Sequence, residues 1–281
     1  MSEKISLYIP AYNAEKTIEF SINSILEQTV KIDEIIVVND SSIDDTVQIV
    51  KKYSEIKIIN NEKNFGLGFN RNKAILDSKN EIIANIDSDV VLEKNWAEIL
   101  LDKLGQNKIG MCGGNMKEKL INNSFNMWRA KYYSQNWGNK DILNPPFLFG
   151  CNSMQYKSIW KEIGGYDEEL FTNGEDINYS KKINASTNFN LFYSSDAMCY
   201  HLQDDNLNTL TKRVWRYHSF GYKIKKVSFF RFLKLSIKQL KFLFQRSIFN
   251  LFKLEFSYIF INFCVFIYFI KYEFKNYLKE K

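Results

Sequence analysis

Four short apolar runs, separated by helical patterns and turns, dominate the first third of this 281-residue chain. They cover Ile5–Ile9, Glu34–Asn39, Ile56–Ile59 and Glu81–Ile86. Their apolar residues are nearly continuous and often β-branched, which is typical of strands buried on both faces of a parallel sheet. We therefore expect an α/β fold in which helices cover both faces of a mostly parallel sheet.

Helical patterns occupy the segments between these runs. Asn13 is a candidate cap for the first helix, and Ser42 with Asp45 resembles a capping box for a helix through Val50. Leu67–Leu76 is a third predicted helix. The first helix is predicted to bury one face, formed by Ile18, Ile22, Ile25 and Leu26.

Polar residues follow the strands at their carboxyl ends, where ligands bind in parallel sheets. They are the turn Pro10–Asn13, then Asp40, then Asp87 and Asp89. The paired carboxylates are hard oxygen donors suited to Mg²⁺ or Mn²⁺, although an Asp-Ser-Asp turn is a simpler alternative. No G-x-G-x-x-G follows the first run, which argues against a dinucleotide-binding fold.

The cysteines and the N-terminus indicate the compartment. Cys112, Cys151, Cys199 and Cys264 lie far apart without a C-x-x-C pair. This spacing argues against a zinc site or disulfide framework and suits a reducing cytosol. No long apolar segment precedes Pro10, so we expect no secretory signal.

Four stretches together resemble a family 2 glycosyltransferase with the GT-A fold. Three are "SLYIPAYNAEKTIEFSINSILEQT", "IIVVNDSSIDDT" and "NIDSDV", and the fourth is "GCNSMQYKSIWKEIGGYDEELFTNGEDINYSKKI" at residues 150–183. The resemblance extends over residues 4–205. It implies a Rossmann-like GT-A sheet and transfer of a sugar from a nucleotide donor to an acceptor, with inversion at the anomeric carbon.

The resemblance assigns a metal site to "NIDSDV". It makes Asp89 the direct ligand of a divalent ion, Mn²⁺ or Mg²⁺, which offsets the charge of the departing diphosphate. Asp87 is expected nearer the ribose and metal-bound water, with Ser88 beside the nucleotide. His201 is a candidate third ligand, although a lone histidine is often structural.

The nucleoside site is implied by the first two stretches. Asp40 is expected to accept a hydrogen bond from the base, and Tyr12 to offer a flat face or to pack. The turn expected to bind the nucleoside comprises Pro10, Ala11, Tyr12 and Asn13.

"NFGLGFNRNKAI" matches the glycine-containing stretch of the same family. Gly66 and Gly68 are expected to let the backbone pass close to the nucleotide. Arg71 is a candidate for a phosphate or base contact, with a solvated helix charge as the alternative.

The acceptor hydroxyl must lose a proton as it attacks, which requires a base within hydrogen-bond reach. By resemblance, "NGEDIN" supplies Asp176 as the general base and Glu175 as a group that assists acceptor binding. The alternative is that both acids only stabilise a helix N-terminus.

Two further polar groups lie beyond the resemblance. "KRVWR" (residues 212–216) faintly resembles the Q-x-x-R-W signature of processive family members, but its glutamine is missing. We therefore expect transfer of a single sugar, with Arg213 as a candidate phosphate contact. His218 lacks a matching context and is interpreted as structural.

The C-terminal segment has a different charge from the rest of the chain. Residues 1–205 contain 22 Lys/Arg and 29 Asp/Glu, whereas residues 206–281 contain 16 and 3. On a helical wheel of Phe229–Leu254, every Lys and Arg lies opposite a large apolar face, which is typical of an interfacial membrane helix. That face includes Phe229, Leu233, Ile237, Leu240, Phe244, Ile248 and Leu251.

An uncharged run, Phe256–Ile270, follows. Its 15 residues would span about 22 Å as a helix, less than the roughly 30 Å of a hydrocarbon core. We expect it to embed in one leaflet or to pack on the preceding helix. A dimer interface is the alternative, and nucleic-acid binding is disfavoured because the aromatic residues lie on an apolar face.

These patterns predict a GT-A domain, residues 1–205, with a nucleotide-binding half (1–104) and an acceptor half (105–205), followed by a helical basic and aromatic tail, 206–281. The expected enzyme transfers a sugar, from UDP by family frequency, to a hydroxyl of a saccharide or lipid-linked saccharide, at the cytoplasmic face of an anionic membrane. One alternative is a polyprenyl-phosphate sugar synthase, whose phosphate acceptor needs less help from a base. Another is a GT-A-like scaffold that binds sugar nucleotides without catalysis.

Overall fold

The computed structural model describes residues 3–106, 108–219 and 228–278. Contacts between residues divide the chain into two compact units, which are described separately. Unit 1 comprises Met1–Lys119 and Gln135–Leu202, and unit 2 comprises Leu120–Ser134 and Gln203–Lys281.

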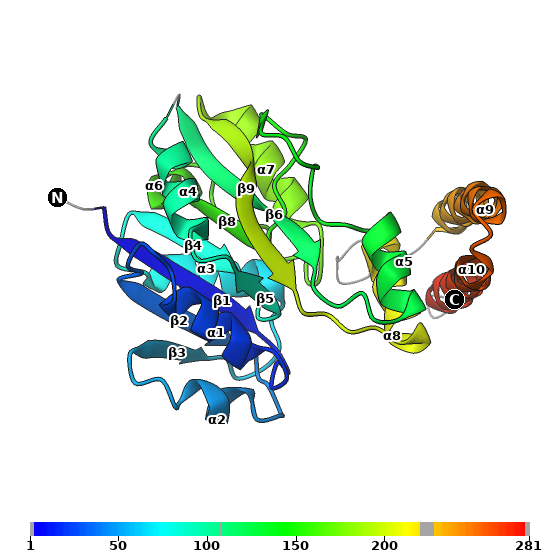
Figure 1. Cartoon of the computed structure of the whole chain (residues 1–281), viewed down its shortest axis with the longest axis horizontal. Coiled ribbons are helices and arrows are strands. Elements are labelled where there is room, and N and C mark those ends of the chain that lie inside the picture. The colour runs from blue at the N-terminus through cyan, green and yellow to red at the C-terminus, as the bar shows by residue number, and fades with distance from the viewer. Residues whose placement is uncertain (1–2, 107, 220–227, 279–281) are drawn as a thin grey trace. The chain divides into compact units, whose positions relative to one another are not determined.

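Unit 1 is built on a mixed sheet (Figure 1). Among the described residues, nine strands pair in the order β3-β2-β1-β4-β8-β6-β9-β5, with β7 beside β9. The strands are β1 (Ile5–Ala11), β2 (Glu34–Asn39), β3 (Ile56–Asn60), β4 (Ile82–Ile86), β5 (Val90–Leu92), β6 (Ile109–Glu118), β7 (Ile142–Leu143), β8 (Asn152–Tyr156) and β9 (Asn190–His201).

The N-terminal half of the sheet confirms the predicted parallel arrangement. β1 pairs in parallel with β2 and with β4, and β2 pairs in parallel with β3. Alternate residues of β2 enter two different hydrophobic clusters: Ile35 and Val37 lie in one, Ile36 and Val38 in the other. The strands are apolar throughout because both of their faces are covered.

Helices cover both faces of the sheet (Figure 1). Residues of α1 and α4 join the cluster on one face, and residues of α3, α6 and α7 join the cluster on the other. The helices of unit 1 are α1 (Ile18–Leu26), α2 (Thr46–Val50), α3 (Leu67–Asp77), α4 (Trp96–Leu104), α6 (Lys157–Glu162) and α7 (Glu175–Ser186).

One edge of the sheet collects strand ends from both halves of unit 1. The parallel strands β1, β2 and β4 end there. β8 is antiparallel to β4 and β6, so it begins where they end, and β9 is parallel to β6. The residues that follow β4 therefore lie near the start of β8 and the end of β9. The register brings His201 opposite both Val90 and Glu118.

Unit 2 is helical in its described residues. It contains α5 (Ser124–Tyr132), α8 (Leu207–Ser219), α9 (Phe229–Phe252) and α10 (Phe256–Leu278). The predicted tail, 206–281, is thus described except for 220–227 and 279–281. α5 falls in the predicted acceptor half of the chain, yet it belongs to unit 2 because Trp128 packs in a cluster with Val214, Ile261 and other residues of α8 and α10.

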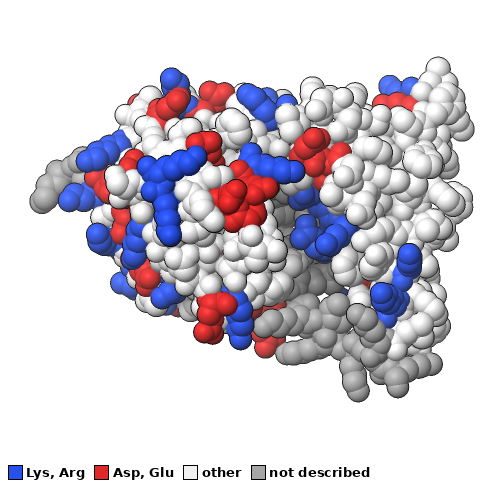
Figure 2. Space-filling view, turned by 90° about the horizontal axis from the view of Figure 1, so that it is seen from below, with Lys and Arg blue, Asp and Glu red and all other residues white. Residues whose placement is uncertain are grey.

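The polar and apolar residues of unit 2 are distributed in an unusual way. Polar side chains are buried between the helices, namely Gln239, Asn250, Asn262 and Glu273, each at most 3% exposed. Large apolar residues face outward instead, including Phe230, Ile237, Phe244, Ile248, Phe260, Phe263 and Ile267. In Figure 2, the face in view of this unit (right) carries few charged side chains.

α10 is longer than the uncharged run that predicted it. The helix has 23 residues, of which the last eight include Lys271, Glu273 and Lys275. It is the one helix among the described residues that is long and apolar enough to cross a membrane by length and composition. The uncharged run alone is too short to span a hydrocarbon core, whereas the helix that contains it is long enough. The expected packing on the preceding helix is confirmed, because α10 packs on α9, where Asn262 Nδ2 donates to Ser247 Oγ (3.3 Å). The expected embedding in one leaflet stays a prediction.

Candidate active site

Asp87 and Arg71 meet at the carboxyl edge of the sheet. Asp87 directly follows β4, and its backbone N–H donates to the carbonyl of Cys151 just before β8 (3.0 Å). Arg71, on α3, is 1% exposed and contacts Asp87 Oδ1 through Nη2 (3.1 Å). Burial raises the pKa of Asp87 to about 6, although Arg71 opposes the shift. Arg71 is therefore not the solvated helix charge considered as an alternative.

Asp89 pairs with His201, as the register of β5 and β9 dictates. His201 Nε2 lies 3.2 Å from Asp89 Oδ2, and Nδ1 lies 3.1 Å from both carboxylate oxygens of Glu118. Burial lowers the pKa of His201, but the two carboxylates outweigh it and raise the value to about 9. The imidazole is thus held between two acids, with Nε2 directed at Asp89.

Glu175 and Asp176 begin α7, after Gly174 in a left-handed conformation (φ 85°). Glu175 Oε1 contacts Arg71 Nε (3.3 Å), so Arg71 joins the acids that follow β4 to those that open α7. Burial, together with the Asp176 charge, raises the pKa of Glu175 to about 7 despite Arg71. Burial also raises the pKa of Asp176.

Gly150 fits closely between Arg71 and Asp176. Its N–H donates to Asp176 Oδ2 (3.0 Å), and the Ile177 N–H donates to Oδ1 (2.7 Å). A Cβ atom at residue 150 would lie 3.0 Å from Arg71 Nη2 and 3.1 Å from the Asp176 Cβ. Glycine therefore lets the start of β8 approach the candidate base, and neither this contact nor the role of Glu118 was foreseen from the sequence.

The predicted nucleoside turn lies at the same edge. Pro10 and Ala11 are buried at the end of β1, whereas the Tyr12 side chain is 51% exposed. Asn13 has a positive φ (51°), and its Oδ1 accepts from the Ile43 N–H (2.9 Å). This bond ties the turn after β1 to the turn after β2.

Asp40 is occupied by its own chain. The carboxylate is 3% exposed and accepts from the Phe65 N–H (2.8 Å), the Gly66 N–H (2.9 Å) and Asn61 Nδ2 (2.9 Å). These bonds shape the loop before α3. Contact between Asp40 and a base stays a prediction.

The two glycines before Arg71 lie against the chain that leads into α7. A Cβ at Gly66 would lie 2.5 Å from the Phe171 carbonyl oxygen, and one at Gly68 the same distance from that of Asp167. The Leu67 N–H also donates to the Phe171 carbonyl (3.0 Å). The glycines therefore admit the chain that leads into α7, and their predicted approach to a nucleotide stays a prediction.

Both predicted helix caps are wrong. α1 begins at Ile18 after Thr17, so Asn13 lies too early to cap it. α2 begins at Thr46, and the Ser42 hydroxyl accepts from the Asn13 N–H instead (3.0 Å). Asp44 Oδ1 bonds the Thr46 N–H (3.1 Å). Local Asx-turn bonding replaced the capping box.

Arg213 and His218 belong to the interior of unit 2. Arg213 Nε lies 3.4 Å from Asp205 Oδ2, and Asp205 also pairs with Arg129. His218 Nε2 lies 2.8 Å from the Tyr133 hydroxyl, and burial lowers its pKa to about 4. The contact of His218 agrees with its structural interpretation, whereas the phosphate contact of Arg213 stays a prediction.

Asp89 and His201 fit a divalent cation that also binds a diphosphate. Among the described residues, no group of three or more His, Cys, Asp or Glu side chains lies close enough together to form a metal site made of protein ligands alone. A carboxylate and an imidazole supply two donors, and Mg²⁺ and its relatives often complete their coordination with phosphate oxygens and water. Glu118 at Nδ1 is the outer carboxylate that commonly orients a ligating histidine. Asp87, held by Arg71, is turned to a different partner.

Comparison with known sequences assigns the chain to a family. Residues 6–164, more than half of the chain, match the family described as Glycosyl transferase family 2. The chain belongs to glycosyl transferase family 2. This membership confirms the family resemblance, and the matched residues include "NIDSDV". "NGEDIN", at residues 173–178, lies beyond the matched range, and the roles assigned to it stay predictions.

Curated relatives match this chain over only part of their own length. The glycosyltransferase GlyA of Streptococcus pneumoniae serotype 4 is 25% identical over 232 residues, which cover 76% of this chain and 33% of GlyA. WfgD of Escherichia coli, named a UDP-Glc:alpha-D-GlcNAc-diphosphoundecaprenol beta-1,3-glucosyltransferase, is 36% identical over 122 residues, or 43% of this chain and 47% of WfgD. The chain thus spans between a third and a half of these two proteins.

The fold is also that of this family. The mannosyltransferase PcManGT from Pyrobaculum calidifontis, solved with GDP-Man and Mn²⁺, superposes with a TM-score of 0.65 at 14% identity. The match covers 99% of this chain and 88% of PcManGT. The predicted GT-A architecture of the family 2 glycosyltransferases is confirmed.

Proposed function

We propose that this protein is a metal-assisted, inverting glycosyltransferase that moves a sugar from a nucleotide donor, a UDP-sugar, to a hydroxyl of a saccharide or lipid-linked saccharide. One observation carries the proposal. Arg71 lies between Asp87, at the candidate diphosphate site, and Glu175, beside the candidate base Asp176. A scaffold that only bound nucleotides would have no need for buried acids with raised pKa values at that place.

The two ends of this arrangement have different tasks. Asp89 and His201 would hold the divalent ion, which when bound offsets the negative charge of the departing diphosphate. Asp176 accepts the proton of the acceptor hydroxyl as its oxygen attacks the anomeric carbon. The new bond forms on the face opposite the leaving diphosphate, so the configuration at that carbon inverts.

Arg71 and Gly150 position these groups. Two hydrogen bonds from backbone N–H groups hold both Asp176 oxygens, which favours the ionised base. Arg71 offsets part of the repulsion between the acids on its two sides. Glu175 is the nearest acid to the base, and we assign it a role in orienting the acceptor.

The central test is a thermal-shift panel of UDP-, GDP- and dTDP-sugars with Mn²⁺ or Mg²⁺, combined with an assay of slow donor hydrolysis. We expect a metal-dependent rise in Tm with one donor class and release of the nucleoside diphosphate. If no donor gives a metal-dependent shift, the proposal fails. Binding without hydrolysis favours the scaffold instead, and transfer to a polyprenyl phosphate that survives loss of Asp176 favours the synthase.

We further propose that unit 2 binds an anionic membrane. The outward stripe of α9 contains Leu233, Ile237, Leu240, Phe244 and Ile248, each at least 40% exposed. Exposed Lys234, Lys238 and Lys241 lie along one side of that stripe at helical spacing. An apolar stripe beside a row of lysines matches acyl chains next to anionic headgroups.

The helices are proposed to lie in one leaflet, and not to cross the bilayer. α10 buries Asn262 and Glu273, and Glu273 Oε1 accepts from Trp215 Nε1 of α8 (2.9 Å). A helix with one face packed on α8 presents only its other face to lipid. The name of WfgD, which specifies a diphosphoundecaprenol acceptor, supports a lipid-linked acceptor for this chain as well.

Flotation of the full chain with vesicles tests this part. We expect co-flotation with vesicles of anionic phospholipid and much weaker binding to neutral ones. In proteoliposomes, a tail that lies in one leaflet should be cleaved by protease added on the side that carries unit 1. If α10 crossed the bilayer, the residues after it would lie on the other side and would be protected. Dimerisation without vesicle binding would establish the dimer interface in place of the membrane.

A further inference from the structure

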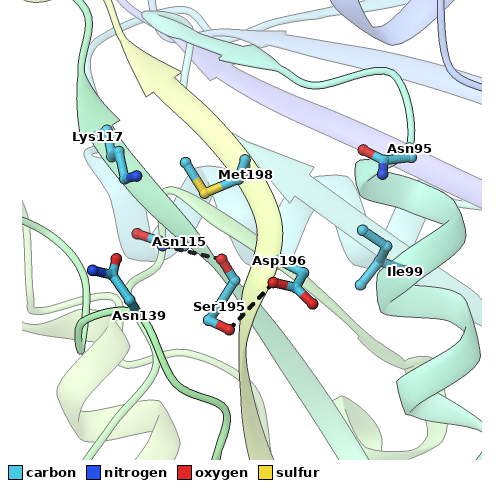
Figure 3. Close-up of a pocket in the computed structure, with 8 residues that line it drawn as sticks. All are labelled: Asn95, Ile99, Asn115, Lys117, Asn139, Ser195, Asp196 and Met198. Carbon is cyan, nitrogen blue, oxygen red and sulfur yellow. Dashed lines mark hydrogen bonds between the residues drawn. The ribbon is translucent and has the colours of Figure 1, made fainter.

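A polar hollow of about 460 Å³ lies in unit 1, and its lining does not include the candidate metal pair Asp89 and His201. Figure 3 shows side chains from three elements around it: β6, the bulged part of β9, and α4 with the residue before it. A fourth contribution, Asn139, comes from the loop between α5 and β7. The lining residues are Asn95, Ile99, Asn115, Lys117, Asn139, Ser195, Asp196 and Met198.

Asn115 has an unused acceptor in the wall of this hollow. The residue is 2% exposed, and its Nδ2 donates to the Ser195 carbonyl (3.1 Å). Its Oδ1 is buried and has no hydrogen-bond partner within the described part of the chain. A buried carbonyl oxygen without a donor is costly, so a ligand hydroxyl that reached it would be favoured.

The lining chemistry selects among ligand classes. The volume falls within the roughly 300–1,000 Å³ typical of small-molecule sites, but most lining residues are polar, whereas such sites are usually apolar. Amides, one hydroxyl, one carboxylate and one ammonium supply both donors and acceptors, which match a polyhydroxylated ring. Among the residues that the structure describes, no aromatic side chain lines the hollow to stack a base. Lys117 and Asp196 also balance in charge, so a nucleotide fits less well.

The hollow is linked to the candidate base through one loop. The Gly150 N–H donates to Asp176, and the neighbouring Phe149 ring lies tilted against Trp137, with ring centroids 5.7 Å apart. The Trp137 indole N–H donates to the Phe147 carbonyl (2.8 Å), which fixes the ring. Asn139 follows two residues later, so its Cα lies within about 7 Å of that of Trp137.

We propose that this hollow is a saccharide subsite that binds a neutral sugar of the acceptor, beyond the sugar that receives the transfer. The inference rests on the proposed glycosyltransferase function and adds where a longer acceptor is recognised. Asn139 and Asp196 hydrogen-bond its hydroxyls, Lys117 donates to a ring or hydroxyl oxygen, and Met198 with Ile99 supplies the apolar contact. Acceptors of two or more sugars are therefore preferred over single sugars.

Saturation-transfer NMR on the full chain tests the subsite, with cellobiose, lactose and N,N′-diacetylchitobiose as probes. We expect at least one disaccharide to bind. Asn139→Ala and Asp196→Ala should each raise its Kd about tenfold, because a hydrogen bond to the sugar is lost. Both side chains are exposed, so neither substitution threatens the fold. Lys117→Ala should also raise the Kd of the disaccharide, because the ammonium no longer donates to the sugar. Lys52→Ala, at an exposed lysine outside the hollow, is its matched control and should leave the Kd unchanged.

Three results would overturn the subsite: no disaccharide binds, binding survives all three hollow substitutions, or UMP with Mn²⁺ displaces the sugar. Donor hydrolysis, measured on the same samples, separates this inference from the proposed function. If Asp196→Ala still hydrolyses the donor but binds the disaccharide more weakly, the result supports both the subsite and the proposed glycosyltransferase function. Disaccharide binding without any hydrolysis sustains the subsite and removes the transferase.

Discussion

Both units of this protein contain a buried apolar cluster, but they differ in the side chains that they turn outward. Unit 1 encloses its aliphatic strands and brings its charged groups to one edge of the sheet, where Arg71 connects Asp87 with Glu175. Unit 2 encloses Gln239 and Asn262 and turns phenylalanines outward. Burial of apolar surface drives folding in water, whereas outward apolar residues are stable only against an apolar partner. The contrast is the basis of the proposal that unit 2 lies against lipid while unit 1 lies in water.

The largest expected effect tests the edge of unit 1. Asp176→Asn should lower the rate of sugar transfer by about a thousandfold, since a positioned general base typically contributes 10²–10⁴-fold. Donor binding, followed by the metal-dependent thermal shift, should persist because Asp176 lies on the acceptor side. Asp102→Asn, on the exposed face of α4, is the control and should retain full turnover. Near-normal transfer by Asp176→Asn would remove the assignment of the base.

The second effect concerns the buried cation. Arg71→Met leaves Asp87 and Glu175 without their shared counter-charge, and breaking a buried ion pair costs about 3–5 kcal/mol. We expect a loss of that size in the free energy of unfolding, measured with urea, together with loss of transfer. Lys73→Met removes a surface i,i+4 pair with Asp77 (3.5 Å) and should cost about 0.5 kcal/mol or less. Equal losses of unfolding free energy in the two variants would show that the buried ion pairs of Arg71 contribute no more to stability than a surface pair.

Features of the fold and the site that depend on neighbouring residues are predicted from the sequence, whereas contacts between residues far apart in the chain are not. The first four strands were predicted correctly because apolar continuity is a local signal, and α7 was located from "NGEDIN". The pairing of His201 with Glu118 depends on the register of β6 and β9, which joins residues 83 apart. No local pattern encodes such a register, so Glu118 was missed.

Ambiguity arose where a short motif had two physical uses. Gly66 and Gly68 match a nucleotide-binding stretch, but the same small residues here admit the backbone of Asp167 and Phe171. Ser42 fits a capping box, yet it bonds the turn after β1. The sequence shows that a residue without a side chain, or one with a hydroxyl group, is present at a position. Which other part of the chain contacts that residue depends on the tertiary fold.

The third effect tests the exterior of unit 2. Phe244 and Phe260 are 59% and 58% exposed, so the double substitution Phe244→Ser and Phe260→Ser removes little buried surface in water. Stability should change by less than about 1 kcal/mol, whereas binding to anionic vesicles should fall by roughly 100-fold, at about 1.5 kcal/mol or more for each lost side chain. Ile9→Ser, buried in unit 1, should show the reverse pattern. Vesicle binding that withstands the double substitution would contradict the lipid-facing assignment.

The smallest effect is a pH dependence of transfer. Glu175 has a pKa of about 7 in the folded protein against 4.5 ordinarily, so between those values the folded chain retains a proton that the unfolded chain loses. Its contribution to stability is therefore complete below about pH 4.5 and is lost as the pH rises through 7. Activity should run the other way, because the ionised form assists the acceptor: kcat is expected to fall about fivefold from pH 7 to pH 6.

Glu175→Gln identifies the group responsible for this limb. The variant should keep a residual rate that no longer declines between pH 7 and pH 6, and its stability should lose the corresponding pH dependence. Measurements at saturating donor and metal separate this effect from protonation of His201, whose pKa is raised by Asp89 and Glu118 against the effect of burial. A limb that persists unchanged in the variant belongs to another group. The pH dependence of kcat would then not report ionisation of Glu175. The contacts of Arg71 with Asp87 and Glu175 would stabilise the fold without affecting the rate of transfer.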